Sequence, residues 1–251
     1  MAKFIKFLLY SFIIFITVWA FLAFILIQFG LETKRFNSLI IEQVKKYNED
    51  LNLDIKKVKI YLNISELTNP KIVVRLKDPT IILGKEKVEL ESISTNIGIV
   101  PYFKDKFILE NFFISTKNNK IRNLLSIAAL QKPLIVIYNG FLKDGYANAI
   151  GSINFDENGK IIDFNLRGEI KDGKIKFNDK FDFNNINFDF TYNKDEIFIE
   201  NVSFDYKKLN FFSDQIHIAT IGPDGERLVL GDIRNEKTLI NSNLFTNLFE
   251  N

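Results

Sequence analysis

The sequence lacks cysteine altogether and has a single histidine among its 251 residues. The first absence excludes disulfide bonds, thiolate metal ligands and a cysteine nucleophile. The histidine, His217, has no second histidine or cysteine with which to build a zinc site. It alternates with Ile216 and Ile218, which favours a structural role in a strand over catalysis. Glycine-rich phosphate-binding motifs and the GxSxG nucleophile motif are also absent, so we expect neither a metal nor a cofactor.

Neither sign of charge dominates the chain. It has 33 lysines and arginines against 31 aspartates and glutamates, for a net charge of +2. This balance does not favour nucleic acid as a partner. Two carboxylates could in principle form an acid–base pair, but Glu86, Glu89 and Glu91 lie on the polar side of one predicted strand, and Asp156 and Glu157 lie in a turn. We therefore expect that the protein is not an enzyme.

One long segment near the N-terminus contains no charge. Residues 7–29, FLLYSFIIFITVWAFLAFILIQF, are long enough to cross the roughly 30 Å hydrocarbon core of a membrane as a helix. A cleaved signal peptide would have a shorter apolar region that ends in small residues, whereas this one ends Ile27-Gln28-Phe29. The segment predicts an uncleaved transmembrane helix after a short tail, residues 1–6. Lysines lie on both sides of it, so charge alone leaves its orientation open.

An amphipathic helix is predicted within residues 30–50. Apolar side chains recur there at helical spacing, with Lys, Glu and Gln between them. Such a helix could close one end of the domain that follows or lie on the membrane surface. The apolar positions are Phe36, Leu39, Ile40, Val44 and Tyr47.

Residues 51–251 read as one domain built mainly of β-strands. Turn sequences such as DENG and YNKDE separate short alternating segments, which predicts about a dozen consecutive, mostly antiparallel strands. A helical insert near residues 118–130 interrupts them, where Ile121, Leu124, Leu125 and Ala128 have helical spacing. The expected fold is mainly β: two N-terminal helices, then a long curved sheet with one short inserted helix.

The apolar side of these strands could fill a closed core or line an open surface. In residues 159–177, GKIIDFNLRGEIKDGKIKF, apolar and polar side chains alternate on either side of a predicted Lys-Asp-Gly turn. A sandwich or barrel would bury the apolar side, whereas an open, trough-like sheet would leave it free for acyl chains. The membrane anchor and the plug-like helix favour the trough. Its candidate lipid-binding residues are Ile162, Phe164, Leu166, Ile175, Phe177, Ile186, Phe188, Phe190 and Tyr192.

Several segments together resemble a known family. These are the anchor, FNSLIIEQVKKYNEDLNLDIKKVKIYL, LKDPTIILGKEKVELESISTNIGIVPYFKDKFILENFFIS and the hairpin-like GSINFDENGKIIDFNLRGEIKDGKIKF. They are similar to the N-terminal part of the AsmA-like family, which includes the TamB-like and YhdP-like proteins. The likeness extends over about residues 1–215 and includes a proline-containing step before a strand, Pro101 to Ile114. It is a pattern of hydrophobicity and turns without catalytic residues.

The resemblance implies a single-pass inner-membrane protein whose bulk is periplasmic and whose β-groove binds phospholipid acyl chains. The expected function is phospholipid transport between the inner and outer membranes, or envelope maintenance, with other envelope proteins as partners. A dozen strands at roughly 4.8 Å spacing give a sheet on the order of 60 Å long, too short for a complete bridge. We therefore expect a small member that acts with partners, a loader at the inner membrane, or the front part of a longer protein. The alternative function is an anchored scaffold with a closed β-core that assists outer-membrane protein assembly through a strand edge.

Overall fold

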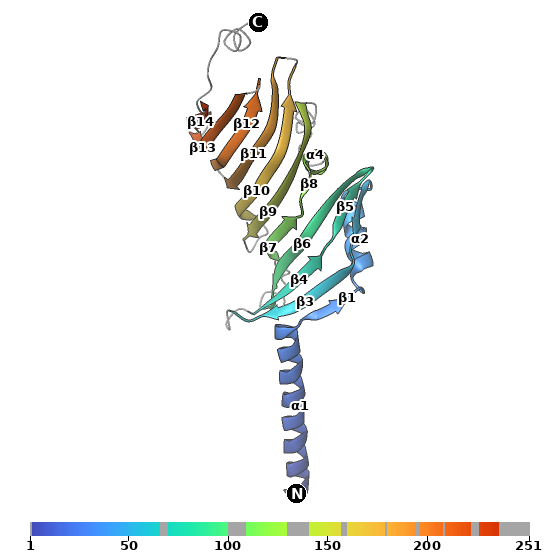
Figure 1. Ribbon diagram of the computed structural model, residues 1–251. Coiled ribbons are helices and arrows are strands. Elements are labelled where there is room, and N and C mark those ends of the chain that lie inside the picture. Colours follow the sequence, from blue (N-terminus) through green and yellow to red (C-terminus); the bar gives the residue numbers. More distant parts are fainter. Residues whose placement is uncertain are drawn as a thin grey trace.

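A long N-terminal helix stands apart from the rest of the chain (Figure 1). The computed structural model describes residues 2–65, 70–99, 109–129, 141–156, 160–178, 180–193, 196–207, 209–221 and 226–235. Helix α1 (Ala2–Gln28) contains a segment, Phe4–Gln28, that is long and apolar enough to cross a membrane. Its large apolar side chains are mostly exposed, as expected for a helix that lipid surrounds. A signal sequence near the N-terminus can meet the same criteria of length and hydropathy.

A single antiparallel sheet makes up most of the remaining structure. Its strands follow the order β1-β3-β4-β6-β7-β9-β10-β11-β12-β13-β14, with β2, β5, β8 and β15 paired at the side of this path. In Figure 1 the sheet leads away from α1, and the C-terminal strands lie farthest from it. The strands are β1 (Leu31–Thr33), β2 (Leu51–Asp54), β3 (Lys57–Asn63), β4 (Lys71–Lys77), β5 (Thr80–Leu83), β6 (Glu86–Gly98), β7 (Leu109–Thr116), β8 (Asn119–Lys120), β9 (Leu142–Phe155), β10 (Ile161–Lys176), β11 (Asp182–Asn193), β12 (Glu196–Tyr206), β13 (Leu209–Ile221), β14 (Glu226–Gly231) and β15 (Arg234–Asn235).

The predicted mainly β architecture is confirmed, and the sheet is open. Strands β1 and β14 occupy its two edges and do not pair with each other, so the alternative of a closed sandwich or barrel is wrong. Consecutive strands are neighbours because the connections are short, which is the geometry of a meander. The structure has fifteen strands where the sequence predicted about a dozen. Part of this difference in strand number arises because two long strands are each divided by a kink: β2 continues as β3, and β4 continues as β5.

The kink between β4 and β5 falls at Asp78, whose φ is +48°. Its amide donates to the carbonyl of Glu91 at 3.0 Å, and the Leu90 amide donates to the carbonyl of Pro79 at 2.9 Å. Strand β6 therefore pairs with β5 through its first half and with β4 through its second half. Such an irregular step bends a sheet and increases its twist.

Helix α2 (Asn37–Tyr47) packs on the sheet near this kink. Its Ile40, Ile41 and Val44 contact a buried cluster that consists of Leu53, Ile55, Val58 and Leu76. The side chain of Asn37 fixes the start of the helix by donating to the Ile55 carbonyl at 2.7 Å. Of the two predicted positions for the amphipathic helix, the structure therefore supports closure of one end of the domain.

The structure corrects two local predictions. Residues 31–33, expected within the helical segment, form strand β1 because they pair with β3. The Lys-Asp-Gly sequence at 171–173 is a bulge inside the continuous strand β10, where the sequence had predicted a turn. Asp172 has a φ of +53° there, a conformation that Asp adopts more readily than most residues. The predicted inserted helix is confirmed as α4 (Ile121–Ala128). Residues 101–108 of the family-like segment lie outside the described residues.

Candidate functional site: the apolar face of the sheet

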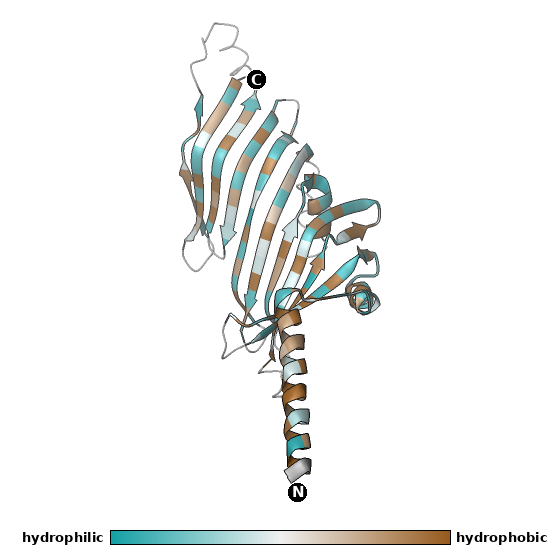
Figure 2. Ribbon diagram, turned by 60° about the horizontal axis from the view of Figure 1, so that its bottom comes forward, coloured by the Kyte–Doolittle hydropathy of each residue, from teal (hydrophilic) through white to brown (hydrophobic). Residues whose placement is uncertain are grey.

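One face of the sheet is apolar from the anchor end to the far edge. Directly paired residues form a row across ten strands that contains no charged side chain. Figure 2 shows the underlying alternation of hydrophobic and hydrophilic residues along the strands. From β3 to β14 this apolar row consists of Val58, Leu76, Ile93, Ile114, Gly151, Leu166, Tyr192, Ile197, Ile218 and Val229.

The opposite face of the sheet is mostly polar, although Phe113, Ile150, Phe198 and Leu230 also lie on it. The neighbours of the apolar row along each strand point to that side, and they include Lys57, Ser94, Asn165 and Thr191. His217 also lies there: its ring stacks on Phe198 with centroids 4.4 Å apart, and its Nε2 is 3.4 Å from Oε1 of Glu196. Among the described residues, no group of three or more His, Asp or Glu side chains is placed to hold a metal.

Helices cover only part of the apolar face. Helix α2 packs on the face over Val58 and Leu76. Helix α4 packs over β9, where Ile121 is so close that a Cβ on Gly145 would lie 2.8 Å from its Cδ1. Within the described chain, strands β10 to β13 make substantial contacts only with other strands. The described residues therefore place no packed layer above the apolar face of these four strands, which we call the uncovered face.

Most of the candidate lining residues meet on this uncovered face. Leu166 pairs with Tyr192, and Ile175 pairs with Phe183 on the next strand. The rings of Phe164 and Tyr192 are 5.3 Å apart, an edge contact typical of aromatic clusters. Seven of the nine lie on this face: Phe164, Leu166, Ile175, Ile186, Phe188, Phe190 and Tyr192.

Two candidates lie away from the centre of the face. Ile162 sits at a register shift between β9 and β10 and is 59% exposed. Phe177 follows the end of β10 at the sheet margin, where its ring lies 4.8 Å from that of Phe141. Both residues follow the alternation of the sequence, so they were included in the predicted set. The register shift at Ile162 and the end of β10 before Phe177 are not visible in the sequence.

The uncovered face also contains residues that the sequence analysis missed. Ile197 and Ile199 on β12 pair with Ile218 and Ile216 on β13, and all four are partly exposed. Farther along these strands, the Phe204 ring stacks on Phe211 at 5.3 Å and contacts Phe183 at 5.8 Å. The segment EIFIENVSFDY does alternate between apolar and polar residues, as a strand with one apolar face should. The apolar residues change from odd to even positions at one residue within it, however.

That change of phase occurs at a row of bulges. Asp172, Asn185 and Asn201 have φ values of +53°, +51° and +54° on three neighbouring strands. Side chains hold these positions: Asn185 donates to Asp205 at 2.6 Å, and Asn201 donates to Asp189 at 2.8 Å. Each bulge inserts one residue, so apolar side chains of opposite sequence parity return to the same face. The bulges thus extend the uncovered face along the length of the strands.

The paired row on the uncovered face contains no charged side chain, and its one polar side-chain atom is the Tyr192 hydroxyl oxygen. Its side chains are aliphatic and aromatic, and they are only partly exposed because neighbours on adjacent strands shield one another laterally. Comparison of the chain with models of known protein families, with curated proteins and with solved structures finds no match.

Proposed function

We propose that this protein is a membrane-anchored lipid-binding protein whose uncovered face shields phospholipid acyl chains from water. The apolar row across ten strands carries the proposal, because it continues without a charge from the anchor end to the far edge. A soluble domain that used this face for its own core would cover it with a second layer. In the described chain, only the part near α2 and α4 is covered in this way.

The energetics of the proposal are those of hydrophobic burial. Each methylene removed from water contributes about 0.8 kcal/mol, so ten methylenes laid on the uncovered face contribute about 8 kcal/mol before the cost of ordering the chain. No bond is made or broken in this function. Binding requires only a continuous apolar surface, which also lets a chain slide from one strand to the next.

The proposed place of action is the envelope of a cell with two membranes. There α1 anchors the protein in the inner membrane and the sheet lies in the periplasm, as in the AsmA-like family that the sequence resembles. The function would be to move phospholipid between the inner and outer membranes, or to maintain the envelope, together with other envelope proteins. Support for this setting comes from the apolar helix and the open, curved sheet, which have the form that such a protein requires.

Photo-crosslinking in native membranes tests the proposal. A photoreactive amino acid replaces Phe164, Phe190 or Tyr192 on the uncovered face, and Asn165 or Thr191 on the polar face serves as the matched control. We expect lipid adducts at the first three positions and at neither control, detected by mass spectrometry of the purified protein. Equal lipid labelling of both faces, or adducts only to protein, would contradict the proposal.

A second candidate function rests on the far edge of the sheet. Strand β14 is exposed along its length, and Leu228, Val229 and Leu230 are 42%, 62% and 52% exposed. An open edge with apolar side chains can pair with a strand of another protein, as in an assembly factor for outer-membrane proteins. In the same crosslinking experiment, this function is favoured if Val229 yields protein adducts while the uncovered face yields no lipid.

A further inference from the structure

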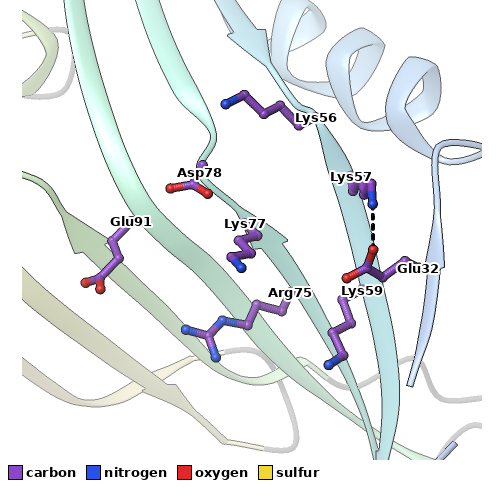
Figure 3. Close-up of a pocket in the computed structure, with 8 residues that line it drawn as sticks. All are labelled: Glu32, Lys56, Lys57, Lys59, Arg75, Lys77, Asp78 and Glu91. Atoms are coloured by element: carbon purple, nitrogen blue, oxygen red, sulfur yellow. Dashed lines mark hydrogen bonds and ion pairs between the residues drawn. The ribbon is translucent and has the colours of Figure 1, made fainter. Parts of the chain in front are cut away.

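A basic hollow lies on the polar face of the sheet, on the side opposite the uncovered face. It has a volume of about 610 Å³, and Figure 3 shows its side chains along β1, β3, β4 and β6. Five cationic and three acidic residues line it, which leaves an excess of two positive charges. They are Glu32, Lys56, Lys57, Lys59, Arg75, Lys77, Asp78 and Glu91.

The hollow lies where the chain leaves the membrane helix. Helix α1 ends at Gln28, and Glu32 of β1 follows it by four residues. Gly30 between them has a φ of +68°, and a Cβ on it would lie 2.8 Å from the carbonyl oxygen of Ile60 and 2.9 Å from Cε of Lys59. The lysine stem therefore packs against the exit of the helix. A membrane that contains α1 would place its headgroup layer at this level.

The three carboxylates of the hollow already have partners. Glu32 pairs with Lys57 at 2.8 Å, and Asp78 pairs with Lys117 at 2.9 Å. The hydroxyl of Ser115 donates to Glu91 at 2.7 Å. The hydrogen bond from Lys57, and then its charge, hold the pKa of Glu32 below its usual range. Each of the three carboxylates is therefore already engaged by a neighbouring side chain.

The remaining cations are left facing one another. Lys59 is paired directly with Arg75 across β3 and β4, and Lys57 is paired with Lys77. Like charges placed opposite each other destabilise a sheet. Glu32 lies directly opposite Lys59 on β1, but its ion pair is with Lys57. Within the described chain no ion pair joins Lys59 or Lys77 to a carboxylate, and the Arg75 guanidinium donates only to the Ser92 hydroxyl at 3.4 Å. Two adjacent pairs of this kind are stabilised when an anion lies between them.

We infer that this hollow binds the phosphate of an anionic phospholipid headgroup in the membrane that α1 enters. The inference rests on the proposed membrane anchor and does not depend on lipid binding by the uncovered face. A guanidinium and ammonium groups form charge-assisted hydrogen bonds with phosphate oxygens. A headgroup bound there would hold the first strands against the membrane and neutralise the like-charge pairs.

Binding to the full chain in a neutral detergent tests the inference. The probes are phosphatidylglycerol and phosphatidylcholine of equal chain length, compared by native mass spectrometry, with inorganic phosphate as a competitor. We expect a preference for phosphatidylglycerol of about fivefold to tenfold, weakened by salt. The double variant Lys59→Gln/Arg75→Gln should lose it, whereas Arg167→Gln/Arg227→Gln, which removes the same charge elsewhere, should keep it.

Further variants separate this site from folding and from the uncovered face. The charge-conserving variant Lys59→Arg/Arg75→Lys should retain the preference. Phe190→Gln should lower binding of both lipids and leave their ratio unchanged, so failure of the proposed function is distinguishable from failure of this site. Equal binding of the two lipids by the unmodified protein would overturn the inference. So would displacement of the lipid by inorganic phosphate at equal concentration, which would assign the hollow to free phosphate.

Discussion

At the scale of single residues, glycine decides how closely the strands of the uncovered face approach. Gly168 pairs with Ala149 on one side and with Phe190 on the other. A Cβ at this position would overlap the carbonyl oxygen of Asn148 and lie 2.8 Å from the Phe190 ring. The aromatic ring of Phe190 therefore lies over the glycine.

Gly168→Ala should lower the free energy of unfolding by about 1–3 kcal/mol, the usual cost of overpacking, because a backbone oxygen cannot move aside. Gly151→Ala is the matched control: its Cβ would lie 3.1 Å from Cγ2 of Ile114 and 3.4 Å from Cδ1 of Leu166, both side-chain methyl groups, and 3.9 Å from the carbonyl oxygen of Asn165. We expect a smaller loss there. Urea unfolding followed by circular dichroism measures both. Equal stability of the two variants would show that the sheet relaxes around Gly168.

Asn and Asp residues at the bulges change which side chains reach the uncovered face. At Asn201 the apolar positions change from odd to even numbers, from Ile199 to Val202, while the strand continues. Alternation alone assigns the second set to the wrong face. The bulge is identified only by a positive φ and by the hydrogen bond to Asp189 on the neighbouring strand. At Asp172 on β10 the sequence predicted a turn where the structure has a bulge, because Asp and Gly are common in turns and in bulges alike.

At the scale of elements, α2 has the clearest structural role. It covers the apolar face where the sheet begins and shields Val58, which is fully buried. Its apolar spacing was visible in the sequence. The sequence did not show whether the apolar side of α2 packs on protein or on lipid, because an amphipathic helix has the same pattern in both cases.

Ile41→Ala should lower the free energy of unfolding by about 2 kcal/mol, because it removes methyl groups that pack on the buried cluster. Lys45→Ala on the exposed side of the same helix is the control, and we expect a change within about 0.5 kcal/mol. Thermal or urea unfolding of the full chain in detergent provides the measurement. If Ile41→Ala left stability unchanged while reducing membrane association, α2 would belong to the membrane surface after all.

At the scale of the whole molecule, the open sheet sets the reach of the protein. Eleven strands along the sheet order, at about 4.8 Å spacing, give a span of about 50 Å. This span is shorter than the 60 Å expected from a dozen strands. Strands β2 and β5 do not add to the span, because they lie in line with β3 and β4. In the proposed function, a sheet of this length would carry an acyl chain away from the membrane that α1 enters.

The anchor predicts the mass of the mature protein. If α1 is retained, intact mass spectrometry of protein purified from membranes should give the full 29.2 kDa chain, and alkaline carbonate should leave it in the membrane fraction. A cleaved signal sequence would instead give a chain shorter by about the length of α1, released by carbonate. That result would contradict the membrane anchor on which both the proposed function and the proposed headgroup site depend.

The sequence by itself determined the apolar helix, the alternation along the strands and the short connections that make a meander. Each depends on residues close together in the chain, where periodicity and turn chemistry act. Only the tertiary structure decided that the sheet stays open, that α2 lies on it, and that Lys59 faces Arg75 beside Glu32. These features depend on the pairing of distant segments. A register shift of one residue would move every side chain to the other face, and the bulges at Asp172, Asn185 and Asn201, which change the register, were not identified from the local pattern.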